Sequence, residues 1–582
     1  MCGIFAVCHA KCSKATYYSL EEAKKRSKRQ RHRGPDFDGY YQDARTGDIL
    51  CHERLAIVDL YAHQPLQGTT PNSWVVHNGE IYNHTDLREN ELHGIHMRST
   101  CDSEVIIFLF EKMKSGMMCN MLDGIFAFAL IHDGKFLAAR DPIGIKQMYY
   151  GVDKDGRYMF CNEMKCIEDC CGQYEMGIFP PGHYWTPEEG FVRYYTPKWT
   201  DFRNCIKALD LRHLHDSLVK SVHKRLMSDA PMGVLLSGGL DSSLVSSIAA
   251  REMKHRGLAV HSFSIGTDAN SPDVIAARKV ADHIGTQHHE YYFAIEEGIK
   301  NLRNLIWHLE TYDITSIRAS TPMYFLSGHI REMGIKSVLS GEGADEIFGG
   351  YLYFHNAPTD EDFLRETIER VLNLNTADCL RADKSSMAQS LEVRVPFLDK
   401  EFVEVAMLTD PQFKRAQRLE DGRSCEKYAL REAFNSDVLY DLSDDPERKD
   451  HPYLPDEILW RQKEQFSDGV GYSWIDKLME YCAEQISDKE FAQAEKVFPI
   501  NTPHSKEAYY MRKTFHELFP SDRAAMTVRK WIPKWQKNID PSGRASTIHE
   551  NTKEKHDATQ EKANLKKRMV TTKADMRSEQ HA

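Results

Sequence analysis

The sequence predicts two units of different architecture, a β-rich N-terminal unit and an α/β unit built on a parallel sheet. Up to about residue 195, strand-like segments follow one another and are separated by turn signals such as Asp133-Gly134 and Asp155-Gly156. From about residue 207, short apolar strands alternate with helical segments, which is typical of a parallel sheet covered by helices.

Composition restricts the class of protein. The chain has 582 residues, of which 41% are hydrophobic and 28% are charged, as in globular proteins with several domain-sized units. Its net charge of −11 gives no general attraction to nucleic acid or anionic membranes. Neither a membrane-spanning apolar run nor a secretory signal is evident. The 14 cysteines show no paired C-x-x-C spacing, so we expect reduced thiols in a cytoplasmic protein.

Within the β-rich unit, the segments that read as strands are Leu50–Asp59, Trp74–His77, Ile125–His132, Lys135–Ala139 and Gln147–Gly151. The segment Asp102–Lys114 reads as a helix, with Ser103 or Asp102 as its cap. The basic run Lys24–Arg33 has two interpretations, a nucleic-acid patch or a solvated helix face. The acidic chain and the absence of aromatics in the run favour the helix face.

In the α/β unit, Gly233–Leu236, Ala259–Ile265 and Lys336–Leu339 are short apolar strands, each followed by a turn and a helical segment. The stretch Asp437–Glu457 is acidic and contains proline, which predicts a surface loop. From about Asn551 the chain is polar, free of aromatics and mixed in charge, which favours a disordered tail.

The chain begins Met1-Cys2-Gly3, so removal of the initiator methionine would leave cysteine at the N-terminus. Such a residue carries a thiol nucleophile and an α-amine whose pKa of about 7.7–8.0 lets it take the thiol proton at neutral pH. A cysteine at position 2 is usually an ordinary residue, so this hypothesis depends on the rest of the chain.

The loop Ser237–Ser243 (SGGLDSS) follows a strand and begins a helix. Its glycines let backbone N–H groups approach an anion, and the helix N-terminus adds unpaired donors. No lysine follows the glycines, so the loop is not a Walker A loop and is suited to the two phosphates that leave as pyrophosphate. An ordinary strand-to-helix turn is the alternative, and the accompanying serines and aspartate disfavour it.

A second strand end carries residues 340–350 (SGEGADEIFGG). Two parallel strands that both end in Gly/Ser/acidic loops predict a nucleotide crevice. Asp241 and Asp345 are candidate Mg²⁺ ligands together with phosphate oxygens, and Glu342 is a candidate general base. A role as a helix cap would explain any single carboxylate. It does not explain three acidic residues within the one glycine-rich segment 340–350.

Longer strings give the chain a resemblance to a known family. In the first unit they are RGPD (33–36), HERLAIVD (52–59), NGEIYN (78–83) and ARDP (139–142), which resemble amidotransferases with an N-terminal nucleophile (class II). In the second unit they are SGGLDSS (237–243), Glu310–Tyr324, RVPFLD (394–399) and KEQFSDGVG (463–471). From Cys2 to about Gly543, the chain resembles the glutamine-hydrolysing asparagine synthetases.

The resemblance implies an α+β N-terminal nucleophile hydrolase domain of layered sheets and helices at 2–195, and a linker at 196–210. It further implies an α/β synthetase domain of the ATP-pyrophosphatase type at 211–543 and a polar tail at 544–582. The implied activity is ATP-dependent conversion of aspartate to asparagine through β-aspartyl-AMP, with glutamine as nitrogen donor. It also implies Mg²⁺, an internal channel for ammonia and a homodimer, with no nucleic-acid or membrane partner.

The resemblance also implies residue roles at the glutamine site. Cys2 would attack the side-chain amide, and Asn78 and Gly79 would donate to the oxyanion. Arg54 would pair with the glutamine carboxylate, and Glu80 and Asp102 would hold its ammonium group. The segment of Leu55, Ala56, Ile57 and Val58 would complete the glutamine site.

At the ATP site, the implied contacts of the nucleotide are Leu235, Ser237, Gly238, Gly239, Asp241, Ser242, Ile265, Ser340 and Gly341. Lys463 and Mg²⁺, held by Asp241 and Asp345, would neutralise charge as the aspartate carboxylate attacks the α-phosphorus. Glu342 would assist formation of the adenylate or take a proton from the attacking ammonia, and both roles stay open.

Two departures from the family pattern and two alternatives remain. Gln147 stands where relatives often have proline, and the acidic stretch Asp437–Glu457 is longer than expected and lies shortly before Lys463.

A related carboxylate-adenylating amide ligase that uses free ammonia would lack the residues of the glutamine-binding site. A non-catalytic regulatory homologue would have lost one site. Both sets of residues are present here, which argues against both alternatives.

Overall fold

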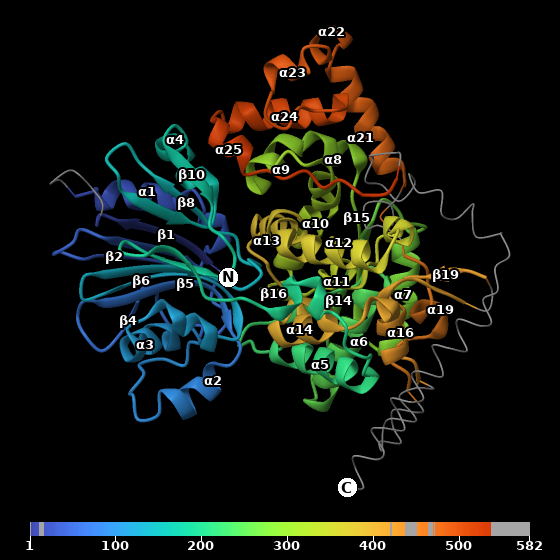
Figure 1. Ribbon diagram of the computed structural model, residues 1–582, viewed down its shortest axis with the longest axis horizontal. Helices are drawn as coiled ribbons and strands as arrows, with labels where there is room; N and C mark the ends of the chain where they lie inside the picture. The colour runs from blue at the N-terminus through green and yellow to red at the C-terminus, as the bar shows by residue number, and fades with distance from the viewer. Residues whose placement is uncertain are drawn as a thin grey trace.

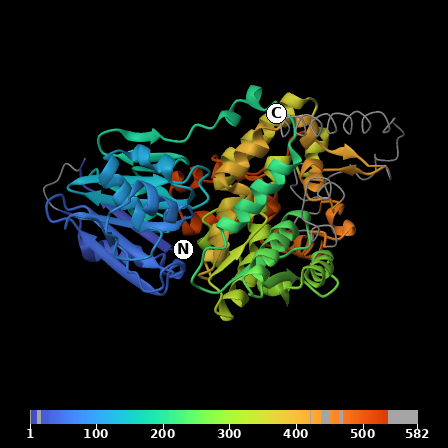
Figure 2. The ribbon, with the colours of Figure 1, turned by 90° about the horizontal axis from the view of Figure 1, so that it is seen from below.

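The computed structural model describes residues 2–10, 17–419, 422–436, 451–463, 470 and 472–536. Two lobes lie side by side, the N-terminal lobe drawn in blue to teal and the second lobe in green to red (Figure 1). The connecting segment crosses between the lobes along one side of the molecule (Figure 2). Across the described ranges, we find no helix that is long and apolar enough to span a membrane.

Two six-stranded antiparallel sheets form the described part of the N-terminal lobe. The first, in the order β10-β8-β9-β1-β3-β2, consists of β1 (Cys2–Cys8), β2 (Phe37–Gln42), β3 (Ile49–Arg54), β8 (Tyr149–Val152), β9 (Tyr158–Cys161) and β10 (Glu175–Ile178). The second, in the order β12-β11-β7-β6-β5-β4, consists of β4 (Leu66–Gln67), β5 (Ser73–Ile81), β6 (Gly124–His132), β7 (Lys135–Arg140), β11 (His183–Thr186) and β12 (Gly190–Arg193).

The side chains of β1 alternate between two apolar clusters, as the period of a strand requires. Ile4 and Ala6 pack between the two sheets, whereas Phe5 and Val7 belong to a cluster that includes Ala23 of helix α1 (Leu20–Lys28). On the outer face of the second sheet, helix α3 (Glu104–Met113) packs against β5 and β6. The lobe is therefore layered helix, sheet, sheet, helix, and its first strand is buried on both faces.

The second lobe is built on a five-stranded parallel sheet with the order β15-β14-β13-β16-β17. Its strands are β13 (Met232–Leu235), β14 (His261–Gly266), β15 (Gln287–Tyr292), β16 (Ser337–Leu339) and β17 (Glu392–Arg394). Because β13 and β16 are parallel neighbours, the loops that follow them meet at one edge of the sheet.

Helices surround this sheet and extend toward the C-terminus. They are α5 (Leu211–Lys224), α6 (Leu240–His255), α7 (Pro272–Ile284), α8 (Ile295–Lys300), α9 (Leu302–Leu309), α10 (Ile314–Glu332), α11 (Ala344–Phe348), α12 (Asp360–Asn373), α13 (Asp378–Met387), α14 (Lys400–Leu408), α15 (Pro411–Lys414), α16 (Tyr428–Ala433), α19 (Asp456–Leu459), α21 (Tyr472–Gln485), α22 (Asp488–Phe491), α23 (Ala494–Val497), α24 (Lys506–Leu518) and α25 (Asp522–Met526). Helix α24 packs on α9, and α25 contacts β10 of the first lobe, so the last helices bridge the two lobes (Figure 1).

The smaller elements are α2 (His84–Asp86), α4 (Glu168–Cys171), the hairpin of β18 (Gln417–Arg418) and β19 (Ser424–Cys425), and the short turns η1 (Arg31–Arg33), η2 (Leu87–Glu91), η3 (Gly116–Met121), η4 (Met164–Cys166), η5 (Lys198–Thr200), η6 (Phe202–Asn204), η7 (Leu352–Asn356), η8 (Leu374–Thr376) and η9 (Pro396–Leu398).

The predicted fold class is confirmed, a layered α+β domain followed by an α/β domain with a parallel sheet. One local prediction was wrong: the strand predicted over Leu50–Asp59 ends at Arg54, and the next residues leave the sheet as a loop. Ser103 lies at the N-cap of α3, one of the two positions predicted, but its side chain makes no capping bond, since its Oγ lies 2.7 Å from Nδ1 of His77.

Three expectations fall wholly or partly outside the described residues. They are the loss of Met1, the polar tail at 544–582 and most of the acidic stretch Asp437–Glu457. Residues 464–469 and 471 of the family string that begins at Lys463 also lie outside them.

Candidate functional site

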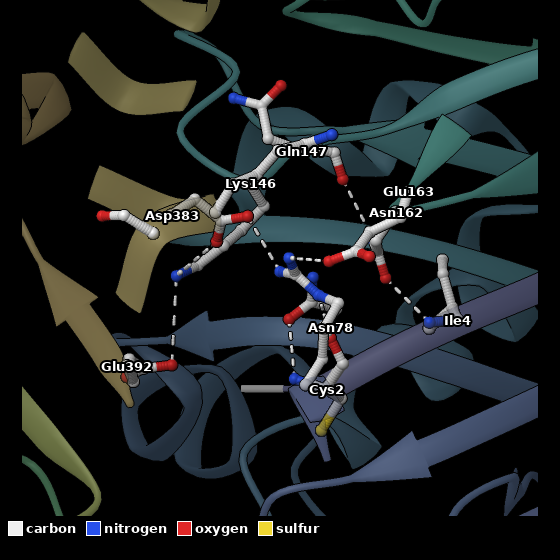
Figure 3. A network of polar contacts seen from close by, with 12 residues as sticks. Cys2, Ile4, Asn78, Lys146, Gln147, Asn162, Glu163, Asp383 and Glu392 are labelled. Atoms are coloured by element: carbon white, nitrogen blue, oxygen red, sulfur yellow. Dashed lines mark hydrogen bonds and ion pairs between the residues drawn. The ribbon is translucent and has the colours of Figure 1, made fainter. Parts of the chain in front are cut away.

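Cys2 lies at the start of β1, in the interior of the first lobe. It is 6% exposed, and its register partner on β3 is Arg54. Its backbone nitrogen donates to Oδ1 of Asn78 at 2.9 Å (Figure 3). Its Sγ lies 3.9 Å from the carbonyl of Leu55. Burial raises the pKa of the thiol, and the nearby charge of Arg54 opposes this. A base is therefore needed to form the thiolate.

Asn78 and Gly79 lie on β5 beside this cysteine. While Oδ1 of Asn78 accepts from Cys2, its Nδ2 is buried and has no hydrogen-bond partner. A free buried amide donor next to a nucleophile is suited to an oxyanion. Gly79 has a φ of +141°, and a Cβ there would lie 1.8 Å from the carbonyl oxygen of Ile125. Only glycine therefore fits beside Asn78.

Arg54 organises the loop that follows β3. Its buried guanidinium donates to the carbonyls of Val58 at 3.2 Å, Asp59 at 2.5 Å and Leu60 at 3.4 Å. In the same loop, the N–H of Ala56 donates to the Asp36 carboxylate at 2.9 Å. The structure thus brings Arg54 and the predicted 55–58 segment together.

The two carboxylates predicted for the glutamine ammonium are both buried, and burial raises the pKa of each. Asp102 accepts from the N–H of Ile81 at 2.7 Å. Glu80 makes an ion pair of 3.1 Å between its Oε1 and Nη2 of Arg394, which belongs to β17 of the second lobe. Its other oxygen, Oε2, has no hydrogen-bond partner, so it is available to a ligand cation.

In the second lobe, an open cavity of about 1090 Å³ lies where β13 and β16 end. Its lining includes most of the residues predicted for the nucleotide: Leu235, Ser237, Asp241, Ser242, Ile265, Ser340, Gly341, Glu342, Asp345 and Lys463. Gly239 lines the adjoining cavity, and the carbonyl of Gly238 accepts from Arg461 at 3.0 Å. All the predicted ATP-site residues therefore gather at one edge of the parallel sheet.

Two lysines neutralise the predicted metal-binding carboxylates. Nζ of Lys427 lies 2.5 Å from Asp241 and 2.5 Å from Asp345, and Nζ of Lys463 lies 2.6 Å from Asp345. Burial by itself would raise the pKa of Asp345, but the two lysines hold it below its usual range. Burial raises the pKa of Asp241.

The donor set fits Mg²⁺ only in part. Oδ1 of Asp241 is buried without a hydrogen-bond partner, and carboxylate oxygen is the ligand that Mg²⁺ prefers. No group of three potential metal ligands occurs among the residues whose positions are described. Phosphate oxygens and water would have to complete the coordination of a metal held by Asp241 and Asp345.

A further charged group faces the same cavity. Nη2 of Arg381 donates to Glu342 at 2.7 Å and lies 2.5 Å from Asp378. All three residues line the cavity, and burial raises the pKa of Glu342. The cavity therefore offers a cation and two carboxylates near the Ser237–Ser243 loop, which suits a zwitterionic substrate.

One residue connects the two sites. The guanidinium of Arg394 pairs with Glu80, and the carbonyl oxygen of Arg394 accepts the N–H of Ser340 at 2.9 Å. Next to it, Lys146 of the first lobe lies 3.9 Å from Glu392 and 4.0 Å from Asp383 (Figure 3). The boundary between the lobes is thus a buried network of paired charges.

Sequence reasoning missed Lys427, Arg381, Asp378 and Arg461 as site residues, and it did not assign a role to Arg394. None of them lies in a glycine-rich loop, and each reaches its site from another element, which spacing along the chain does not reveal. Only Arg394 carried a signal, because it begins one of the family strings.

Comparisons with known proteins agree with this division into two sites. A family model described as asparagine synthase matches residues 213–368 and 356–542, and one described as a glutamine amidotransferase domain matches residues 1–177. A Dictyostelium discoideum protein named "Probable asparagine synthetase (glutamine-hydrolyzing)" is 48% identical over 582 residues, covering 95% of this chain and 100% of that protein.

Two plant proteins are similar over nearly the same length. Asparagine synthetase (glutamine-hydrolyzing) 1 of Lotus japonicus is 46% identical over 575 residues, covering 94% of this chain and 93% of that protein. The protein with the same printed name from Arabidopsis thaliana is 45% identical over 571 residues, covering 94% of each chain.

Proposed function

Because this chain belongs to the asparagine synthase family, we propose that it makes asparagine from aspartate and ATP with glutamine as the nitrogen donor. The products would be asparagine, AMP, pyrophosphate and glutamate. The observation that carries the proposal is the free, buried Nδ2 of Asn78 beside Cys2. A protein that used only external ammonia would have no need of an amide donor held there without a partner.

At the first site, the thiol of Cys2 attacks the glutamine amide after its proton passes to the N-terminal amine that loss of Met1 would expose. Asn78 Nδ2 and Gly79 donate to the oxyanion, ammonia leaves, and water releases glutamate from the thioester. Arg54 retains donors beyond those that hold the 58–60 loop, and these would bind the glutamine carboxylate. Glu80 and Asp102 would hold its ammonium group.

At the second site, the side-chain carboxylate of aspartate attacks the α-phosphorus of ATP, and the bond to pyrophosphate breaks. The Ser237–Ser242 loop, with Arg461 behind it, would hold the leaving pyrophosphate. Mg²⁺ bound by Asp241 and Asp345 would neutralise phosphate charge. Lys427 and Lys463 already pair with these carboxylates and would turn toward phosphate oxygens when ATP binds.

The group of Arg381, Asp378 and Glu342 would receive the aspartate. A guanidinium suits the α-carboxylate of aspartate, and a carboxylate suits its ammonium group. Glu342 would then be close enough to take a proton from ammonia as it attacks the adenylate. Family membership also implies that ammonia passes inside the protein, that the chain forms a homodimer and that it works in the cytoplasm.

Product analysis tests this function. With glutamine, aspartate and MgATP, we expect asparagine, glutamate and AMP in equal amounts, as measured by mass spectrometry. Formation of ADP instead of AMP would contradict the adenylate. Asparagine formed only from added ammonia would favour the alternative, an adenylating ligase without glutaminase activity.

A further inference from the structure

A second cavity lies beside the nucleotide cavity and plays no part in the proposed reaction. It has an open volume of about 420 Å³ and lies between the start of α10, helix α24 and the segment near residue 501. Trp531 lines both cavities, so the two are neighbours. The residues that give this cavity its character are Arg512 and Lys530, together with Asp313 and the ring of Tyr312.

Arg512 is the unusual feature of this cavity. It is 3% exposed, and its Nε and Nη1 have no hydrogen-bond partner. The guanidinium carbon lies 4.9 Å from the ring centre of Tyr312 and 4.7 Å from that of Phe498. Aromatic faces attract a cation, but they do not accept the N–H groups in the guanidinium plane. Burial lowers the pKa of Arg512, because a cation that is removed from water without hydrogen-bond acceptors is less stable in its charged form.

The other charged groups of the cavity do not supply those acceptors. Lys530 is a second cation, and its Nζ donates to the carbonyl of Thr502 at 2.6 Å. The carboxylate of Asp313 accepts the backbone N–H groups of Trp531 and Ser316, each at 2.9 Å. Both oxygens of this carboxylate are therefore committed to the backbone, and the cavity keeps a surplus of unpaired cationic donors.

We propose that this cavity binds a small oxyanion, a carboxylate or phosphate group, through Arg512. An oxyanion supplies in-plane acceptors for the guanidinium, and the two aromatic rings hold the guanidinium in a fixed orientation for it. The cavity is less than half as large as the nucleotide cavity, so it accepts a small anion rather than a second nucleotide. A bound anion would lie against Trp531 and would sense changes at the nucleotide site.

Titration of the full-length protein tests this site in the absence of ATP, aspartate and glutamine. Inorganic phosphate and acetate are the two probes, each added at constant ionic strength, and they distinguish a phosphate site from a carboxylate site. Hydrogen bonds to a charged group contribute about 1.5–3 kcal/mol, so Arg512→Gln should weaken binding by about 10- to 150-fold.

Two further variants keep the test decisive. Ala508 lines the cavity one helical turn before Arg512, so Ala508→Leu should block binding while the cation remains. Arg529→Gln removes an equal charge from an exposed arginine that pairs with Glu369, and it should bind anions like the wild type. Binding of neither probe to the wild type, or equal binding by wild type, Arg512→Gln and Ala508→Leu, would overturn the proposal.

A structure determined in selenate locates the anion independently of these affinities. We expect anomalous density within hydrogen-bond distance of the Arg512 guanidinium. Density confined to the Ser237–Ser242 loop would place the anion in the nucleotide site and would overturn the second site, while leaving the proposed synthetase reaction intact.

Discussion

The proposed glutamine site and the proposed nucleotide site differ in how their buried charges are balanced. In the first, Cys2 and Glu80 lie on antiparallel strands and Asp102 lies just before α3, and burial raises the pKa of all three. In the second, two lysines hold the pKa of Asp345 below its usual range, although burial still raises the pKa of Asp241. The carboxylates of the second site therefore have two lysines beside them, whereas Glu80 of the first site pairs with Arg394.

The proposed substrates would account for this difference. Glutamine carries a positive group of its own, and Glu80 has a buried oxygen without a hydrogen-bond partner that would receive it. ATP is a polyanion, and Lys427 and Lys463, which pair with Asp241 and Asp345, would turn toward its phosphates. Four experiments test this contrast.

Removal of the nucleophile should separate the two sites completely. Cys2→Ala should lower glutamine-dependent asparagine synthesis by more than about a thousandfold, because no other group can form the thioester. Ammonia-dependent synthesis should remain within about twofold of the wild type, since the second site is untouched. Both rates are measured with the same purified protein. Loss of both activities in a folded variant would contradict the two-site scheme.

Changes to the lysine-rich site should have the reverse pattern. Lys463→Ala and Asp241→Asn should each lower synthesis by about 10²–10³-fold, the usual loss when a charge-stabilising group is removed. Glutaminase activity should be spared. Lys220→Ala is the matched control, because Lys220 forms an exposed pair with Glu401. An equal fall in glutaminase activity would argue against the assignment of these residues to the second site.

Arg394 forms ion pairs with carboxylates of both lobes, Glu80 of the first and Glu392 of the second. Arg394→Met leaves Glu80 without its cation and removes the nearer of two cations beside Glu392, which should destabilise the protein by about 3–5 kcal/mol in denaturant unfolding. It should also raise the ratio of glutamate to asparagine formed, because the ion pair that joins the two lobes at Glu80 is lost. Arg203→Gln, which breaks an exposed pair with Asp201, should leave the free energy of unfolding close to that of the wild type. Equal effects of the two variants would disprove a special role for Arg394.

The lobes should also differ in their response to acid. Burial lowers the pKa values of His52 and His77 from 6.5 to about 3, so both are neutral in the folded first lobe. As the pH falls, the unfolded state takes up these protons before the folded state does. The contribution of the two neutral histidines to the free energy of unfolding is complete above pH 6.5 and is lost as the pH falls toward 3. At pH 5, protonation of each of these histidines in the unfolded state should lower the free energy of unfolding by about 2 kcal/mol.

The second lobe contains a histidine of the same kind, His308 of α9, whose pKa burial also lowers to about 3, so the difference applies to the strands that carry the sites. Near β16, Arg225 and Lys224 hold the pKa of Asp399 at about 2, despite its burial, against a usual 3.8. Its contribution is lost only as pH falls from 3.8 toward 2. Hydrogen-exchange protection factors, which correct for the slower intrinsic exchange in acid, should therefore fall on β3 and β5 at pH 5 before they fall on β13 and β16. A simultaneous fall on all four strands would contradict this assignment.

Prediction from sequence succeeded where a site follows a strand end or a recognisable string. The loops after β13 and β16 were located because a glycine-rich segment that follows an apolar strand of a parallel sheet commonly forms part of a nucleotide site. Lys427 was missed because it reaches Asp241 and Asp345 from the residue before α16, about 80 residues beyond the second loop, and nothing local marks it. The N-cap of α3 was located at Ser103, but the sequence did not reveal that the Ser103 hydroxyl contacts His77 of β5 instead of the helix backbone.

The pairing of Arg394 with Glu80 also could not be predicted from the sequence. Both residues belong to family strings, but only packing of the two lobes brings their side chains within 3.1 Å. The sequence therefore supports each site on its own, whereas the contact that joins the two sites exists only in the folded chain.

The central claim is that nitrogen released at Cys2 is used at the second site without leaving the protein. Its most direct test supplies glutamine labelled with ¹⁵N in the side-chain amide together with an excess of unlabelled ammonium, and measures the label in asparagine by mass spectrometry. The account predicts asparagine far richer in ¹⁵N than the ammonium pool of the solution. Asparagine with the same ¹⁵N content as that pool would contradict it.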